Sequence, residues 1–204
     1  MGCNALLLNN EKIICSECNH NLPITNHHFL EHNDTTKKFY GIIPIEFSAS
    51  MLYFHHKGIV QNLIHNLKYK NHQEVGYLLG KWYEKDLETV SQIKTVSEII
   101  PVPLHKKRLE ERGYNQVTTF CEALSKELEI PYNPNLLYRS RYSKTQTKKD
   151  KENRKDIANS LFDVNFTEAD HNKHFLLVDD VMTSGATLES CAKALLKIPN
   201  SKVS

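Results

Sequence analysis

One run of sequence constrains the fold of this chain more than any other: an apolar strand that leads directly into two acids and a hydroxyl-rich turn. It is Phe175 to Thr187, FLLVDDVMTSGAT. Phe175 to Val178 predicts a buried strand, and Ala186 to Leu196 predicts a helix. Strands that alternate with helices form α/β folds, in which ligands bind beyond the carboxyl ends of the strands. The sequence therefore predicts a mostly parallel, Rossmann-like sheet flanked by helices.

The residues that follow this strand combine groups suited to two parts of one ligand. Asp179 and Asp180 come where the strand ends, so their carboxylates are placed to meet a ligand. The loop Thr183 to Thr187 then supplies three hydroxyls and a glycine-permitted turn. Backbone N–H groups that open a helix suit a phosphate dianion. Acids followed by a phosphate-binding loop indicate a sugar phosphate.

The alternative for the acid pair is a strand-end turn or a metal pair, as in a nucleoside triphosphatase. Such an enzyme needs a phosphate-binding partner loop. Neither G-x-x-x-x-G-K-[ST] nor G-x-G-x-x-G occurs in the sequence. The sugar-phosphate interpretation is therefore favoured.

The whole thirteen-residue run resembles, position for position, the signature of type I phosphoribosyltransferases for 5-phosphoribosyl-1-pyrophosphate (PRPP). The resemblance implies that PRPP binds together with Mg²⁺. It implies that Asp179 and Asp180 are the catalytic pair and hold the ribose hydroxyls. The PRPP-binding positions would be Val181, Met182, Thr183, Ser184, Gly185, Ala186 and Thr187.

Two further motifs narrow the resemblance. Pro101 to Leu104 reads PVPL, and Arg112 to Gln116 reads RGYNQ. With the PRPP signature, they resemble the ComF family, phosphoribosyltransferase-like proteins associated with DNA uptake in competent bacteria. By analogy, the pyrophosphate would meet Val102, Pro103, Leu104, Arg108 and Arg112. The alternative is that the second motif only caps the following helix, with Asn115 as N-cap.

A basic segment, Arg139 to Lys155, has no apolar periodicity. The resemblance implies that it is a flexible lid that brings cations over the leaving pyrophosphate. The lid residues would be Arg141, Thr145, Gln146 and Arg154. Two alternatives remain: a loop that merely keeps the surface solvated, or a contact to single-stranded DNA with Tyr138 or Tyr142 as a stacking platform.

The N-terminal region contains a pattern typical of a metal site. Cys15 and Cys18 have the C-x-x-C spacing that lets two thiolates bind one structural Zn²⁺, and Cys3 is a third candidate ligand. The ComF pattern has two such pairs, and the missing cysteine would fall one residue before Met1. Either the start is clipped, or a histidine substitutes, the candidates being His20, His27 and His28. The alternative is a chance pair of buried thiols.

These patterns predict two domains: a cysteine-rich, zinc-finger-like module over 1–38 and a phosphoribosyltransferase-like domain over 39–204. We expect both ends of the chain to be clipped. Within the second domain we expect a hairpin from 40–45 and 48–54, helices around 60–67, 75–83 and 117–128, and short strands at 136–138 and 202–203. A further strand at 99–103 contains two prolines, so it is either an edge strand or stops at Pro101. Gly76 and Gly80 share one helix face, which indicates close packing against a neighbour.

The composition limits where in the cell the protein is expected and which partners it can bind. The net charge is only +2, so the chain is not a polycation that binds nucleic acid indiscriminately. No apolar run reaches the roughly 18 residues of a membrane span, and no secretory signal is evident, so we expect a cytoplasmic protein without membrane insertion. An odd number of cysteines without an export signal favours thiols or metal ligands over disulfides, with Cys121 and Cys191 packed in the core.

Two functions are consistent with these observations. The first is phosphoribosyl transfer from PRPP with release of pyrophosphate. The second is a non-catalytic DNA-uptake component that keeps the PRPP pocket, binds single-stranded DNA and works with a competence helicase. A transferase needs a hood element that forms a pocket for its acceptor, whereas a binding component can leave the ribose carbon open to solvent.

Overall fold

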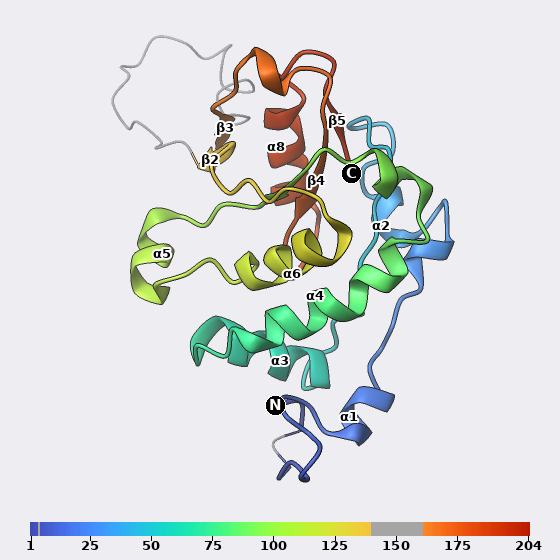
Figure 1. The fold of residues 1–204 in the computed structure, drawn as a ribbon, viewed down its shortest axis with the longest axis vertical. Coiled ribbons are helices and arrows are strands. Elements are labelled where there is room, and N and C mark those ends of the chain that lie inside the picture. The colour runs from blue at the N-terminus through green and yellow to red at the C-terminus, as the bar shows by residue number, and fades with distance from the viewer. Residues whose placement is uncertain (4, 140–160) are drawn as a thin grey trace.

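The computed structural model describes residues 1–3, 5–139 and 161–204 (Figure 1). The helices and 3-10 turns are α1 (Ser16–His20), η1 (His27–Phe29), α2 (Asp34–Lys37), α3 (Ile59–Tyr69), α4 (Glu74–Leu87), η2 (Ser91–Thr95), α5 (Lys106–Arg112), α6 (Thr118–Leu128), η3 (Glu168–Asp170) and α8 (Ala186–Leu195). The strands are β1 (Glu98–Pro101), β2 (Leu137–Arg139), β3 (Phe162–Val164), β4 (His174–Val178) and β5 (Lys202–Val203). None of the helices described combines the length and apolar character that crossing a bilayer requires.

A parallel sheet of order β1-β4-β5 forms the centre of the molecule, with β4 in the middle. Successive side chains of β4 point to opposite faces, as strand geometry requires. Phe175 packs in a cluster with Cys191 and Leu195 of α8. Leu176 packs in a second cluster with Leu124 of α6. The sheet is therefore covered by a helix on each face, which confirms the predicted mixed α/β fold.

Helix α4 packs closely against α6, because Gly76 and Gly80 leave room for the neighbouring chain. A Cβ at Gly76 would lie 2.3 Å from Oγ1 of Thr119, and one at Gly80 would lie 2.7 Å from the carbonyl oxygen of Phe120. The predicted close packing is confirmed. Figure 1 shows α3, α4 and α6 as successive layers below the sheet.

The N-terminal region shares a core with α3 and α4. Ile14, Cys18 and Leu22 pack in one cluster with Leu63 of α3 and Leu79 of α4. These contacts attach the first residues to the helices that follow. The predicted division into 1–38 and 39–204 stays a prediction.

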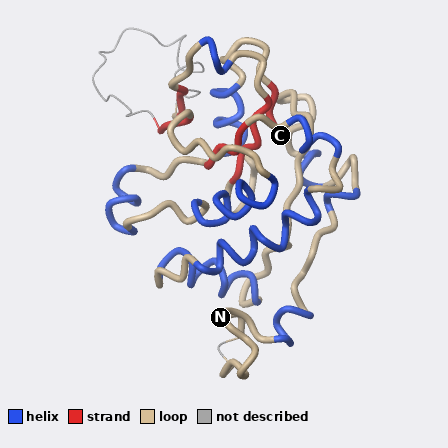
Figure 2. Tube along the Cα trace, viewed as in Figure 1, coloured by secondary structure: helices blue, strands red, loops and turns tan. Residues whose placement is uncertain are grey.

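The predicted hairpin over 40–54 is wrong. This stretch is loop (Figure 2), apart from an isolated antiparallel bridge between Leu52 and Ile24. A hairpin would place alternate apolar side chains on one face. Here Ile43 packs in the α8 cluster, Phe47 in the α6 cluster, and Leu52 against the N-terminal core. The stretch crosses between three clusters and cannot form a two-stranded ribbon.

Candidate functional site

The two acids lie at the carboxyl end of the central strand, as expected. The chain turns after Val178, whose carbonyl accepts a hydrogen bond from the N–H of Val102 at 2.8 Å. The N–H of Asp180 donates to Oδ1 of Asp179 at 2.9 Å. Asp179 and Asp180 both line a cavity of about 420 Å³. The end of β4 thus joins the PVPL turn to the acid pair.

Burial and mutual repulsion disfavour the charged forms of Asp179 and Asp180, and one nearby cation offsets part of this effect. Burial, and then the charge of Asp180, raise the pKa of Asp179 to about 6. The ammonium of Lys68 lies 2.7 Å from Oδ2 of Asp180, and these side chains are 21% and 9% exposed. Oδ2 of Asp180 thus has a counter-ion, although no hydrogen bond to it is found among the described residues. The site is thus prepared for a polyhydroxyl or cationic ligand.

The predicted phosphate-binding loop opens helix α8. Gly185 is the N-cap residue and has φ +85°, a left-handed conformation that favours glycine. A Cβ at this position would also lie 3.3 Å from the ring of Phe39. The flanking residues Thr183, Ser184, Ala186 and Thr187 are exposed. The loop therefore presents its hydroxyls and its helix N-terminus to solvent beside the acids, an arrangement suited to an anion.

Residues of the RGYNQ motif form hydrogen bonds to several elements around the site. The side-chain amide of Asn115 donates to the carbonyl of Val102 at 2.9 Å, and its oxygen accepts from the N–H of Val117 at 3.3 Å. Arg112 donates to Gln116. The hydroxyl of Tyr114 donates to a carbonyl at the end of α3. Asn115 thus joins the PVPL turn to the start of α6, although the N-cap residue of α6 is Val117.

A basic pocket of about 580 Å³ lies between the end of α3 and α5. Its lining residues are Lys68, Tyr69, Lys70, Asn71, Arg108, Glu111, Arg112 and Tyr114. The guanidinium of Arg112 lies 5.5 Å from the ring centre of Tyr69. Lys68 lines this pocket and also contacts Asp180, so the basic pocket adjoins the acid pair. The lining contains four cationic side chains and one acidic side chain, so the pocket suits a ligand with several negative charges.

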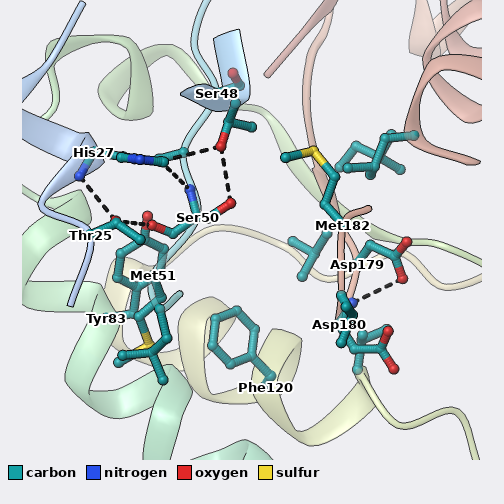
Figure 3. A pocket seen from close by; sticks show the side chains of 18 of the residues that line it. Thr25, His27, Ser48, Ser50, Met51, Tyr83, Phe120, Asp179, Asp180 and Met182 are labelled. Atoms are coloured by element: carbon teal, nitrogen blue, oxygen red, sulfur yellow. Dashed lines mark hydrogen bonds between the residues drawn. The ribbon is translucent and has the colours of Figure 1, made fainter. Parts of the chain in front are cut away.

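A hood segment, residues 25–54, closes the cavity on the side opposite the acids. Figure 3 shows Thr25, His27, Ser48 and Ser50 on one side, and Asp179, Asp180 and Met182 on the other. Met51, Tyr83 and Phe120 lie along the lower side of the same view. The polar groups of the hood bond to one another: His27 Nδ1 is 3.2 Å from Oγ1 of Thr35 and 3.3 Å from the N–H of Ser50. The hood is therefore a preformed wall.

The cysteine cluster forms as predicted. Sulfur atoms of Cys3, Cys15 and Cys18 all lie within 4.8 Å of one another, and Cys15 and Cys3 are 3.6 Å apart. The N–H of Cys18 donates to Sγ of Cys15 at 3.4 Å. Within the described part of the chain, the candidate histidines lie outside this cluster. Cys121 and Cys191 are fully buried in the core, as expected.

The remaining predicted residues fall outside the part of the chain that the structure describes. They are the lid positions Arg141, Thr145, Gln146 and Arg154 and the stacking candidate Tyr142. Strands β2 and β3, which flank this segment, pair antiparallel. Tyr138 lies in β2 and is partly exposed.

Sequence reasoning missed Lys68, Tyr83 and His27. Lys68 lies at the end of an amphipathic helix, where a lysine is ordinary. Tyr83 lies on the apolar face of a helix, and this position predicts that its side chain packs in the core. His27 was considered only as a zinc ligand. No local signal in the sequence indicates that Lys68 contacts Asp180 or that Tyr83 and His27 line the same cavity as the acids.

Comparison with known proteins places the chain among competence and DNA-utilization proteins. It is 31% identical over 140 residues to "Competence protein F" of Haemophilus influenzae, a match that covers 67% of this chain and 61% of that protein. It is 28% identical to "DNA utilization protein YhgH" of Escherichia coli K12, covering 66% of this chain and 60% of the relative. It is 36% identical over 99 residues to "Competence protein ComFC" of Bacillus subtilis, covering 48% and 38%. No family model matches.

Proposed function

Because this chain belongs to the ComF family of competence and DNA-utilization proteins, we propose that it binds Mg²⁺-PRPP and transfers the phosphoribosyl group in the service of DNA uptake. The matched region is about 61% of the length of the Haemophilus relative. The observation that carries the proposal is the position of the acid pair. Asp180 lines the hooded cavity and contacts Lys68, which lines the basic pocket.

This arrangement gives each part of PRPP a chemically matched partner. The ribose hydroxyls would meet the carboxylates of Asp179 and Asp180, and the 5-phosphate would meet the loop that opens α8. The pyrophosphate would meet Lys68, Arg108 and Arg112 in the basic pocket. Bound Mg²⁺ would neutralise part of the charge on the leaving pyrophosphate.

The hooded cavity lies on the other side of the acids and would hold the acceptor. In the transfer, the C1′–O bond breaks and both electrons leave with the pyrophosphate. A nitrogen lone pair of the acceptor forms the new C1′–N bond, and the displaced proton passes to pyrophosphate or solvent. The hood keeps water away from C1′, so the oxocarbenium-like transition state meets the acceptor first.

Calorimetric titration with Mg²⁺-PRPP tests the proposal directly. We expect heat and a thermal shift for the native chain, and weaker binding for Asp180→Asn, which retains the shape of the side chain. A pyrophosphate-release assay with a panel of nucleobases and amines then tests turnover. Absence of both heat and thermal shift would exclude PRPP binding.

We also propose that the cysteine cluster binds structural Zn²⁺. Zn–S bonds of about 2.3 Å in tetrahedral geometry place two sulfurs about 3.8 Å apart. The separation of 3.6 Å between Cys3 and Cys15 fits this value. One coordination position is left for a group outside these cysteines.

The basic pocket favours a second candidate, binding of single-stranded DNA without catalysis. Tyr69 is 69% exposed and offers an aromatic face beside Lys68, Lys70 and Arg112. Aromatic faces with nearby cations bind single strands with little sequence preference. This candidate predicts binding that weakens steeply with salt and is reduced in Tyr69→Ala. If Lys148→Glu/Lys149→Glu/Lys151→Glu instead abolishes binding and Tyr69→Ala does not, the segment outside the described residues is the contact.

A further inference from the structure

Two buried polar atoms in the described part of the chain have no hydrogen-bond partner, and both belong to residues that line the hooded cavity. They are Oη of Tyr83 and Oδ2 of Asp180. Buried polar groups in folded proteins are nearly always paired, because an unpaired one costs about 1–3 kcal/mol. Oδ2 of Asp180 has the ammonium of Lys68 as a counter-ion 2.7 Å away, so Oη of Tyr83 is the one of the two with no polar partner among the described residues, and it marks the hooded cavity as a binding site.

The two atoms serve different parts of the site. Asp180 follows β4 and contacts Lys68, on the side of the basic pocket. Tyr83 comes from α4 and is only 7% exposed. Its ring centre lies 6.4 Å from that of Phe120, which also lines the cavity. The hydroxyl of Tyr83 is thus a polar group in an apolar part of the cavity, separate from the acids that would bind the ribose.

The cavity around Tyr83 favours an uncharged and flat ligand. Met51, Phe120 and Tyr83 supply apolar and aromatic surface. Burial raises the pKa of Tyr83, so its hydroxyl stays neutral and can donate or accept. The charged lining residues of the hood, Asp34 and Lys38, are exposed. A charged ligand group deep in the cavity would lose its hydration without gaining a counter-ion from the hood.

The hood itself leaves few polar groups for a ligand. The hydroxyl of Thr25 donates to the carbonyl of Ser50, and the hydroxyls of Thr35 and Ser50 lie 3.0 Å apart. Burial lowers the pKa of His27, whose Nδ1 is already occupied by this network. The polar groups of the hood thus form hydrogen bonds with one another. The hydroxyl of Tyr83, which has no partner among the described residues, is therefore the group that can recognise a ligand.

We infer that the hooded cavity binds a neutral, planar nitrogen heterocycle as the acceptor of phosphoribosyl transfer, and that the hydroxyl of Tyr83 recognises it by a hydrogen bond. This inference rests on the proposed function for its role as acceptor. The volume of about 420 Å³ lies in the range of small-molecule sites, roughly 300–1,000 Å³. A ring nitrogen of the heterocycle attacks C1′ as the C1′–O bond breaks and the pyrophosphate leaves with its electrons. A nitrogen that carries a hydrogen then releases that proton to pyrophosphate or solvent, whereas a pyridine-type nitrogen, as in nicotinamide, keeps the positive charge.

The test uses the full chain and a panel of free heterocycles: adenine, hypoxanthine, uracil and nicotinamide. Orotate and putrescine serve as anionic and cationic counterparts. Binding is measured by calorimetry with and without Mg²⁺-PRPP, for the native chain, Tyr83→Phe and Tyr77→Phe. Tyr77 lies on the same helix but is 39% exposed, so it is a matched control.

We expect at least one neutral heterocycle to bind, and Tyr83→Phe to weaken it about threefold to tenfold, the value of one neutral hydrogen bond. Tyr77→Phe should leave binding unchanged. Tyr83→Phe should unfold at the same or a higher temperature than the native chain, because it removes an unpaired buried hydroxyl. Its Mg²⁺-PRPP affinity should be unchanged.

The outcomes separate this inference from the proposed function. If Mg²⁺-PRPP binds but no neutral heterocycle does, or if Tyr83→Phe binds it as tightly as the native chain, the inference is overturned and the proposed function stands. If a heterocycle binds through Tyr83 but Mg²⁺-PRPP binds to no variant, the proposed function and the acceptor role fail, whereas the heterocycle site stands. Binding of orotate or putrescine alone overturns the neutral-ligand assignment.

Discussion

The ammonium of Lys68 lies 2.7 Å from Oδ2 of Asp180 and joins the end of α3 to the turn after β4. Neither residue belongs to the other's local structure, since 112 positions separate them in the sequence. The contact holds a cation beside the acid pair at the point where the basic pocket meets the hooded cavity. Lys68 therefore offsets part of the charge repulsion between Asp179 and Asp180.

Replacing Lys68 by methionine should destabilise the fold through Asp180. The loss should fall between the ~1 kcal/mol of an exposed pair and the ~3–5 kcal/mol of a buried one, because Lys68 is partly exposed. In an Asp180→Asn background the same change should be nearly neutral, as a double-mutant cycle by urea denaturation will report. Lys70→Met, at an exposed position, is the control. Equal losses in both backgrounds would show that Lys68 acts by packing alone.

Asp179→Asn should stabilise the unliganded protein, increasingly so as pH rises. The folded-state pKa of about 6 lies above the ordinary value of 3.8, so the native fold favours the protonated carboxyl and loses stability as pH rises between these values. The advantage of the variant should grow by about 2 kcal/mol from pH 4.5 to pH 7.5, at 1.36 kcal/mol for each pKa unit. Urea denaturation at both pH values measures it. A constant difference would contradict the burial of this charge.

The elements around the site were predictable where the pattern is local. The apolar run before Asp179 identified β4, and three-and-four spacing identified α3, α4 and α6. The paired glycines correctly indicated the contact between α4 and α6. By contrast, α5 has no buried residue, so it left no apolar period in the sequence to detect.

The site itself was predictable only on one side. Asp179, Asp180 and the loop to Thr187 are consecutive, so the sequence alone places them together. Lys68 contacts Asp180, and Tyr83 lines the same cavity as the acids, only through tertiary packing, because the two residues come from separate helices. For residues 40–54 of the hood the sequence predicts a hairpin where the structure has a loop, since apolar residues in a short stretch give no sign of which cluster each will join.

Gly185→Ala should weaken both the fold and ligand binding. A residue with a Cβ costs about 1–2 kcal/mol in the left-handed region that Gly185 adopts, and this Cβ would also press on Phe39. Gly41→Ala is a matched control, because Gly41 has φ +72° and open space around its Cα. Thermal unfolding should show a larger loss for Gly185→Ala, and only this variant should lose affinity for Mg²⁺-PRPP. Equal thermal losses would show that the contact with Phe39 is unimportant.

Removing one thiol of the cysteine cluster should remove the metal and loosen the N-terminal region. We expect about one Zn²⁺ per native chain by elemental analysis, as a cluster of thiolates at this spacing indicates. Cys15→Ser should lose most of it and unfold at a lower temperature, because Ile14 and Cys18 share a core with α3 and α4. Cys191→Ala, which alters a buried thiol far from this cluster, should keep its zinc. A chelator should lower the unfolding temperature of the native chain and of Cys191→Ala but leave Cys15→Ser unchanged; equal zinc content in all three proteins would exclude the cluster as the metal site.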